Sequence, residues 1–118
     1  LRRAQEVISS TTGRTPALFR APCGTRWPGL AEVQRQLGLL GVMWTVIGRD
    51  WALPAEAIAR RLIRGARNGA ILCLHDGCEV RPRPDVRPML EAVRRLIPEL
   101  QARGFRFETV SELLCPRN

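Results

Sequence analysis

The sequence predicts an α/β fold in which about four parallel strands alternate with helices. Short runs of apolar and β-branched residues alternate with segments of about 10–15 residues in which apolar side chains recur every three or four positions. Strands separated by helices of this length are joined by crossover connections and run parallel. Four such strands form either a small open sheet or an arc of a barrel whose other strands lie upstream.

The first half of the chain is predicted to form two helices and two strands. Residues 2–12 form a helix that ends before Gly13, and the strand 17–20 runs into a turn with the sequence APCGT. The run 41–47, GVMWTVI, is rich in apolar and β-branched residues and is typical of a buried strand. Between these strands, four apolar residues are spaced for one face of a helix: Leu30, Val33, Leu37 and Leu40.

A third helix and a third strand follow. Pro54 suits the first turn of the helix, and Asn68-Gly69 is expected to stop it. The run 70–75, AILCLH, is the next strand, and residues 76–84 form a loop with two prolines. The apolar face of the helix consists of Ala55, Ile58, Ala59, Leu62, Ile63 and Ala66.

The last third of the chain is predicted to form a helix, a strand and one helical turn. Asp85 caps the helix, Pro98 kinks or restarts it, and Gly104 ends it. The segment 105–110, FRFETV, is a strand by its alternation, and Ser111 caps the last turn. The apolar residues of the helix are Val86, Met89, Leu90, Val93, Leu96 and Ile97.

The composition indicates one domain with a packed core. The chain has 118 residues, the size of one ordinary domain, and its hydrophobic content of 45% excludes a disordered chain. No apolar run approaches the ~20 residues needed to span a bilayer, so we expect no membrane segment. The chain opens on Leu1, and LRRAQEVISS is typical of the middle of a helix, so we expect a fragment or a processed product.

The net charge of +8 comes from arginine, because the chain contains no lysine. Arginine can recognise phosphates or polysaccharides. These arginines are spread along helix faces, however, which favours base composition of the gene as their origin. No aromatic residues interleave with them to stack on bases, so we expect no nucleic-acid partner.

The four cysteines, Cys23, Cys73, Cys78 and Cys115, form no CxxC pair, so neither a zinc ribbon nor a thioredoxin site is indicated. A chain of this length buries a core without covalent links, so we expect reduced, mostly buried thiols rather than a disulfide scaffold. Two alternatives stay open. One is a disulfide between Cys73 and Cys78, and the other is a metal site of Cys73, His75 and Cys78 with Cys23.

Three predicted strands end on residues that can carry chemistry. The first ends in Arg20, the second leads to Asp50-Trp51, and the third ends in His75-Asp76. In parallel α/β folds, functional residues gather where strands end. Each residue alone has an ordinary explanation, as a surface ion pair, a core tryptophan or a structural histidine. Their occurrence at one predicted edge of the sheet indicates a functional site.

At these strand ends the sequence resembles a known family. The motifs LFRAPCG, MWTVIGRDW and ILCLHDG, followed by ARGFRFETVSELL, are similar to the C-terminal half of the polysaccharide deacetylase domain. This is the NodB-like domain of carbohydrate esterase family 4. The resemblance extends from Ala4 to Leu114, so residues 1–118 are expected to form the C-terminal part of one catalytic domain. It implies a partial, distorted (β/α) barrel whose upstream strands lie outside this chain.

The resemblance implies a metal-dependent hydrolase that removes acetyl groups from polysaccharides containing N-acetylglucosamine, such as peptidoglycan or chitin. In the family, a divalent metal, usually zinc, polarises the amide carbonyl and activates a water. An upstream Asp acts as the base, and a His on a late strand protonates the leaving amine.

The same resemblance implies roles for individual residues. By position, His75 is the general acid and Asp50 is the carboxylate that pairs with it. Arg20 corresponds to the arginine that orients the catalytic Asp. Trp51 corresponds to the apolar wall of the acetyl pocket, and the backbone amide of Cys23 stands where the family supplies an oxyanion donor.

The chain departs from the family pattern at three positions. The family usually has an aromatic residue where Cys23 stands, Leu where Cys73 stands, and Asp where Ile47 stands. Cys23 and Cys73, together with Pro22, are predicted to lie beside the substrate. The departures therefore bear on the choice of substrate and on activity.

The family's first two motifs, close to T-F-D-D and H-[ST]-x-x-H, are not in this chain. They supply the base and the three protein metal ligands, so we expect the ligands upstream and none here. The expected partners are a polysaccharide or oligosaccharide, and either the missing N-terminal half or another copy of the chain. Family members often act outside the cytoplasm, which suggests an extracellular or cell-envelope location. The alternative function is an inactive or carbohydrate-binding remnant of the same fold.

Overall fold

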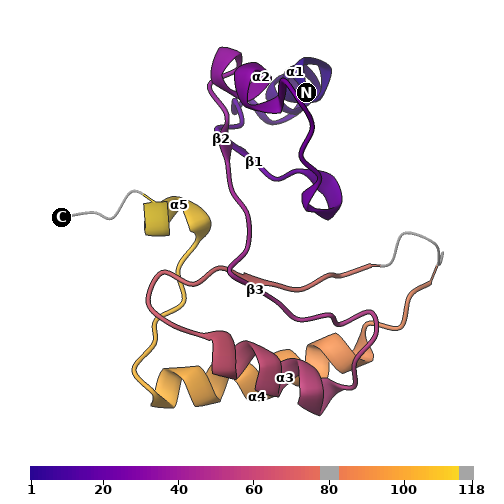
Figure 1. Ribbon diagram of the computed structural model, residues 1–118, viewed down its shortest axis with the longest axis vertical. Helices are drawn as coiled ribbons and strands as arrows, with labels where there is room; N and C mark the ends of the chain where they lie inside the picture. Colours follow the sequence, from indigo (N-terminus) through magenta and orange to yellow (C-terminus); the bar gives the residue numbers. More distant parts are fainter. Residues whose placement is uncertain (78–82, 115–118) are drawn as a thin grey trace. The chain divides into compact units, whose positions relative to one another are not determined.

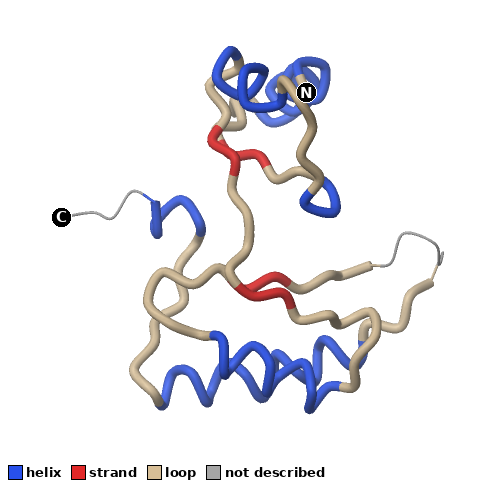
Figure 2. The backbone as a smooth tube through the Cα atoms, in the orientation of Figure 1, coloured by secondary structure: helices blue, strands red, loops and turns tan. Residues whose placement is uncertain are grey.

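The computed structural model describes residues 1–77 and 83–114 and divides the chain into two compact units, Leu1–Met43 and Trp44–Asn118. Each unit combines helices with one pair of short parallel strands, which Figure 2 draws in red. The predicted α/β class and the parallel direction of the strands are therefore confirmed.

The first unit contains a parallel pair of strands, in which Leu18 lies opposite Leu40 and Phe19 opposite Gly41. Its elements are α1 (Arg2–Thr12), β1 (Leu18–Phe19), the 3-10 helix η1 (Pro22–Gly24), α2 (Leu30–Gln36) and β2 (Leu40–Gly41), of which Figure 1 labels α1, α2 and both strands.

Glycines in the left-handed region end both helices of the first unit. Gly13 has a φ of 69° and donates its N–H to the carbonyl of Ser9, so α1 ends where the sequence predicts. Gly38 has a φ of 63° and follows α2 closely. The prediction that Leu40 continues the apolar face of this helix is wrong, because the chain has already turned and Leu40 lies in β2.

The second unit also contains a parallel pair, in which Val46 lies opposite Leu72 and Ile47 opposite Cys73. Its elements are β3 (Val46–Ile47), α3 (Ala55–Gly65), β4 (Leu72–Cys73), α4 (Arg87–Ala102) and α5 (Val110–Leu114) (Figure 1).

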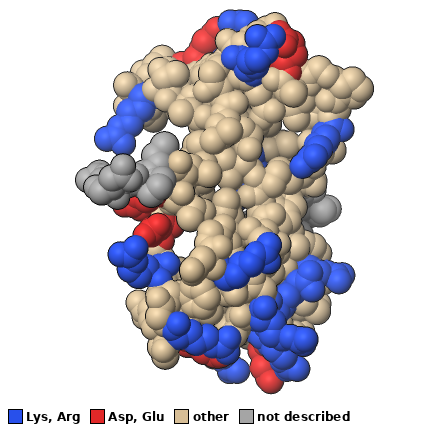
Figure 3. Space-filling view, turned by 60° about the vertical axis from the view of Figure 1, so that its left-hand side comes forward, with Lys and Arg blue, Asp and Glu red and all other residues tan. Residues whose placement is uncertain are grey.

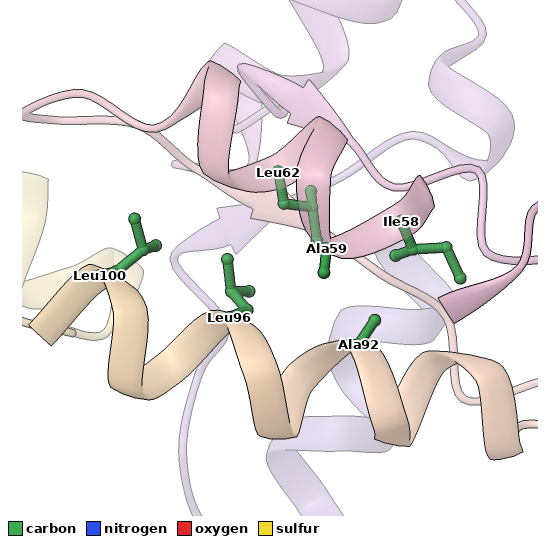
Figure 4. Packing of buried hydrophobic residues seen from close by; sticks show 6 residues of the cluster. All are labelled: Ile58, Ala59, Leu62, Ala92, Leu96 and Leu100. Carbon is green, nitrogen blue, oxygen red and sulfur yellow. The ribbon is translucent and has the colours of Figure 1, made fainter. Parts of the chain in front are cut away.

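The core of the second unit lies between α3 and α4, which pack side by side (Figure 4). The predicted apolar face of α3 supplies half of it, and α4 supplies the other half. Gly65 lets α3 approach β3 closely, since a Cβ atom there would lie 2.5 Å from Cγ2 of Val46. The buried residues of this core are Ile58, Ala59, Leu62, Ala92, Leu96 and Leu100.

Two predicted strands differ from the structure. The run 41–47 is not one strand, because its two ends pair in different sheets: the Val42 N–H donates to Phe19, and the Thr45 N–H donates to Ile71. The segment 105–110 is not a strand in the described part of the chain. Alternation alone does not form a strand without a neighbour to supply the hydrogen bonds of the ladder.

Several predicted helix boundaries also move. The helix α3 ends at Gly65, before Asn68-Gly69, and it begins directly after Pro54. The helix α4 continues through Pro98 without restarting. Its end agrees with the prediction, because Gly104 has a φ of 84°.

The caps of the last two helices are also reassigned. Val86 is the N-cap of α4, and Asp85 accepts the N–H of Arg87 at 3.0 Å. Thr109, not Ser111, caps α5: its hydroxyl accepts the N–H of Glu112, whose carboxylate accepts the N–H of Thr109 at 2.8 Å. This reciprocal pair is a capping box.

Basic side chains are distributed over the face shown in Figure 3, and acidic side chains lie beside several of them. Such pairing favours a solvated surface over a single binding patch for these arginines. None of the helices in the described part of the chain is both long and apolar enough to cross a membrane. The exposed ion pairs include Arg35–Glu32, Arg60–Glu56, Arg95–Glu91 and Arg103–Glu99.

Candidate functional site

Asp50 and His75 form a hydrogen-bonded pair in the second unit. One carboxylate oxygen of Asp50 lies 3.0 Å from Nδ1 of His75, and the other accepts the backbone N–H of His75 at 2.7 Å. The side chain of Asp50 is only 3% exposed, whereas that of His75 is 39% exposed. A carboxylate on Nδ1 favours the tautomer with the proton at Nδ1, which leaves Nε2 as the nitrogen that can face a ligand.

The turn that follows β3 brings Asp50 to His75. Arg49 has a φ of 57°, in the left-handed region that non-glycine residues seldom adopt. Its carbonyl accepts the N–H groups of Ala52 and Leu53, which closes the turn. Gly48 makes room for this turn, since a Cβ atom there would lie 2.6 Å from Cδ2 of Leu74.

His75 lies just beyond the carboxyl end of β4. Leu72 and Leu74 pack against the α3–α4 core. Because side chains alternate along a strand, Cys73 and His75 point to the opposite face. Cys73 is buried and lies opposite Ile47 in the neighbouring strand. The apolar pair Ile47–Cys73 therefore precedes the polar pair Asp50–His75 along the two strands.

Trp51 contacts the imidazole edge to face. The two ring centroids are 5.1 Å apart and the planes are inclined by 80°. Trp51 is 55% exposed. A large apolar surface beside an accessible imidazole nitrogen can hold an apolar group, such as a methyl group, next to a proton donor.

The remaining predicted site residues lie in the first unit. Arg20 follows β1 and donates its Nε–H to the carbonyl of Val42 at 3.1 Å. Pro22 and Cys23 lie in η1 and are exposed, and Cys23 has a φ of 53°. The structure thus brings Asp50, Trp51 and His75 together, while an association of Arg20, Pro22 and Cys23 with them stays a prediction.

The described residues do not fit the metal that the family resemblance implies. Residues 1–77 and 83–114 contain no group of three His, Cys, Asp or Glu side chains that can hold a metal ion. Among the thiols, Cys73 is buried as expected but Cys23 is exposed. Cys78 and Cys115 lie outside the described residues, and so do the alternatives that need Cys78.

Arg49 and Gly48 are site residues that the sequence did not identify. Arginine carries no signal for a positive φ, so its role in turning the chain was not predictable. The glycine offered a weak signal, because an isolated glycine at the end of a strand often marks a close approach.

No family model matches the chain. The chain is 36% identical over 104 residues to a peptidoglycan-N-acetylglucosamine deacetylase of Bacillus cereus, and 39% identical over 114 residues to a chitooligosaccharide deacetylase of Azorhizobium caulinodans. Each match covers 86% of this chain but only 46% and 52% of these relatives. The chain therefore spans about half the length of the curated relatives that it matches.

Solved structures show the same likeness. A family 4 acetyl xylan esterase from Clostridium thermocellum, in complex with a cobalt ion, has a TM-score of 0.76 at 34% identity, over 97% of this chain and 52% of that one. A family 4 pseudoenzyme from Bacillus anthracis has a TM-score of 0.82 at 23% identity, over 97% and 38%. The likeness confirms the predicted fold class, and the pseudoenzyme shows that this fold alone does not establish activity.

Proposed function

Because the chain belongs to the polysaccharide deacetylases of carbohydrate esterase family 4, we propose that it forms the C-terminal part of a deacetylase domain. The reaction is hydrolysis of the N-acetyl group of a polysaccharide that contains N-acetylglucosamine. The names of the two curated relatives support peptidoglycan-like or chitin-like substrates.

The observation that carries the proposal is the pair formed by Asp50 and His75. Hydrolysis of an amide needs a proton on the leaving nitrogen, since an amine anion does not leave. Asp50 holds the imidazole through Nδ1, and an imidazolium in this position can give its Nε2 proton to the amine. The nearly buried carboxylate also stabilises the positive charge that the imidazole carries before the transfer.

Three further roles complete the proposed site. Trp51 forms the apolar wall against which the acetyl methyl group packs, in agreement with its exposure and its contact with the imidazole. The backbone amide of Cys23 donates to the developing oxyanion, and Arg20 orients the catalytic Asp. Pro22 and Cys73 lie beside the substrate in this proposal.

The family's divalent metal, expected to be zinc, supplies Lewis-acid chemistry when it is bound. Since the described residues hold no ligand set for it, we assign its ligands and the base to a segment upstream of this chain. That segment, or failing it a second copy of the chain, is the proposed partner of residues 1–118.

Release of acetate by the full-length protein tests this function. With tetra-N-acetylchitotetraose and with peptidoglycan as substrates, the proposal expects acetate and free amino groups to appear in equal amounts. No acetate from either substrate, with the protein folded and supplied with divalent metal, would support the inactive or carbohydrate-binding alternative.

A further inference from the structure

A depression of about 320 Å³ lies in the first unit, beside the carboxyl ends of β1 and β2. Its lining includes Ala21, which follows β1, and Val42 and Met43, which follow β2. Folds built from parallel strands bind ligands at this edge, because the loops there vary without disturbing the sheet.

Trp27 lines this depression, and the residue is 47% exposed. The backbone at Trp27 is held in place, because its carbonyl accepts the N–H of Leu30 at the start of α2. The preceding loop is closed by Thr25, whose N–H and hydroxyl both donate to the carbonyl of Pro22. An anchored, half-exposed indole in a concave surface is typical of a ligand site.

Gln34 supplies an amide to the same depression. A Cβ atom on Gly41 would lie 2.6 Å from Nε2 of Gln34, so the missing side chain at Gly41 makes room for the amide over β2. The amide offers two donors and one acceptor. Arg26 is the one titratable residue of the lining, which contains no carboxylate.

We propose that this depression, the Trp27 pocket, is a subsite for one N-acetylglucosamine residue of a glycan. A pyranose presents an apolar C–H face, which suits the indole of Trp27, and a rim of hydroxyl and acetamido groups, which suits the amide of Gln34. The inference rests on the proposed function for the class of glycan. It adds a sugar-binding position whose lining residues all lie in the first unit.

Calorimetric titration of the full-length protein with tetra-N-acetylchitotetraose tests the Trp27 pocket. Trp27→Ala is expected to raise Kd by about 3- to 10-fold, the range found for one aromatic contact, whereas Trp27→Phe keeps most of the affinity. Phe107→Ala is the matched control, because Phe107 is also about half exposed, at 49%, and lies in the second unit. An unchanged Kd for Trp27→Ala, or no binding by the wild type, would overturn the proposal.

Gly41→Ala gives a second test if Trp27→Ala does not fold. Its new methyl group displaces only the flexible end of Gln34, so the fold is kept while the amide moves. A several-fold rise in Kd supports the pocket, and an unchanged Kd contradicts it.

Titration with the disaccharide of N-acetylglucosamine and N-acetylmuramic acid distinguishes a chitin-like source of the bound sugar from a peptidoglycan-like one. Equal weakening on both glycans supports a subsite for the N-acetylglucosamine residue that they share, whereas weakening on the muramyl ligand alone overturns it.

Together with the acetate assay, these binding measurements test the Trp27 pocket and the proposed deacetylation independently of each other. If the protein binds the tetrasaccharide through Trp27 but releases no acetate, the proposed function fails and the subsite stands. If it releases acetate with the same Kd and KM in wild type and Trp27→Ala, the subsite fails and the proposed function stands.

Discussion

The carboxylate of Asp50 accepts two hydrogen bonds from one residue, His75, at 2.7 Å from the backbone N–H and 3.0 Å from the ring Nδ1. One nearly buried side chain therefore holds both the end of β4 and the orientation of the imidazole. This relationship gives His75 one fixed ring nitrogen and one available ring nitrogen, as a general acid requires.

The left-handed turn at Arg49 should be necessary for this pair. Arg49→Val places a β-branched residue at a φ of 57°, which is a strained combination. We expect a loss of about 1–3 kcal/mol in the free energy of unfolding, together with a weaker Asp50–His75 contact. Arg49→Gly is the control, because glycine adopts this φ without strain and should stay within about 1 kcal/mol of the wild type. Urea unfolding of both variants of the full-length protein measures the difference, and equal stability would refute the role of the turn.

The close approach of α3 to β3 predicts a penalty for Gly65→Ala. Alanine favours a helix by up to about 1 kcal/mol, but overpacking costs about 1–3 kcal/mol. Because the new Cβ atom would lie 2.5 Å from Cγ2 of Val46, we expect the overpacking to dominate, with a net loss of up to about 2 kcal/mol. Gly77→Ala is the control, since no described atom lies within 4 Å of its Cβ position. Adding Val46→Ala should recover part of the loss if the contact is its cause.

The contribution of the Asp85 carboxylate at the start of α4 to the stability of the protein should be lost at acid pH. Hydrogen bonds from the side chain and then the backbone of Arg87 lower the pKa of Asp85 to about 2, from an ordinary 3.8. A lowered pKa in the folded state means that the carboxylate stabilises the protein fully above pH 3.8 and loses this contribution as the pH falls through about 2. Asp85→Asn should therefore be less stable than the wild type at neutral pH, with a difference that vanishes in this window.

Thermal unfolding of the two proteins at a series of pH values checks the prediction for Asp85. Added salt should also reduce the difference at neutral pH, because this ion pair is exposed to solvent. A difference in Tm that stays constant down to the lowest pH would show that the ionised carboxylate is not the cause.

Residues 1–118 alone should not behave as a stable monomer. In the described residues each sheet has two strands, so each strand has an unpaired edge on which another chain can pair. In the second unit, a depression of about 480 Å³ is lined by Ile71, which precedes β4, and by Phe107, which is 49% exposed. We therefore expect self-association or aggregation on size exclusion unless the upstream segment is supplied. A monomer that unfolds cooperatively would contradict this prediction.

Periodicity in the sequence predicted the features that depend on local patterns. The apolar face of α3 and the left-handed glycine after α1 are set by neighbouring residues, and the structure agrees with both. The proximity of Asp50 and His75 was predicted from their place at strand ends, since parallel strands bring these ends to one edge.

Features that depend on partners were not predictable from local patterns. The run 41–47 divides between two sheets, and 105–110 forms no strand within the described residues, because pairing is decided by contacts far along the chain. The positive φ of Arg49 is imposed by the turn that Asp50 needs, and arginine itself does not favour it. The cap of α5, by contrast, did carry a local signal, since Thr109 and Glu112 have the spacing of a capping box.

The central claim is that His75, held by Asp50, protonates a leaving amine. The most direct test compares kcat/KM of the full-length wild type and His75→Ala on two acetyl substrates. Tetra-N-acetylchitotetraose needs a proton on its leaving nitrogen, whereas p-nitrophenyl acetate releases a stable anion that needs none. The account predicts that His75→Ala loses about 10²–10⁴-fold on the amide but little on the ester, with a smaller loss of the same kind for Asp50→Asn. Equal losses on both substrates, or an unchanged rate on the amide, would contradict it.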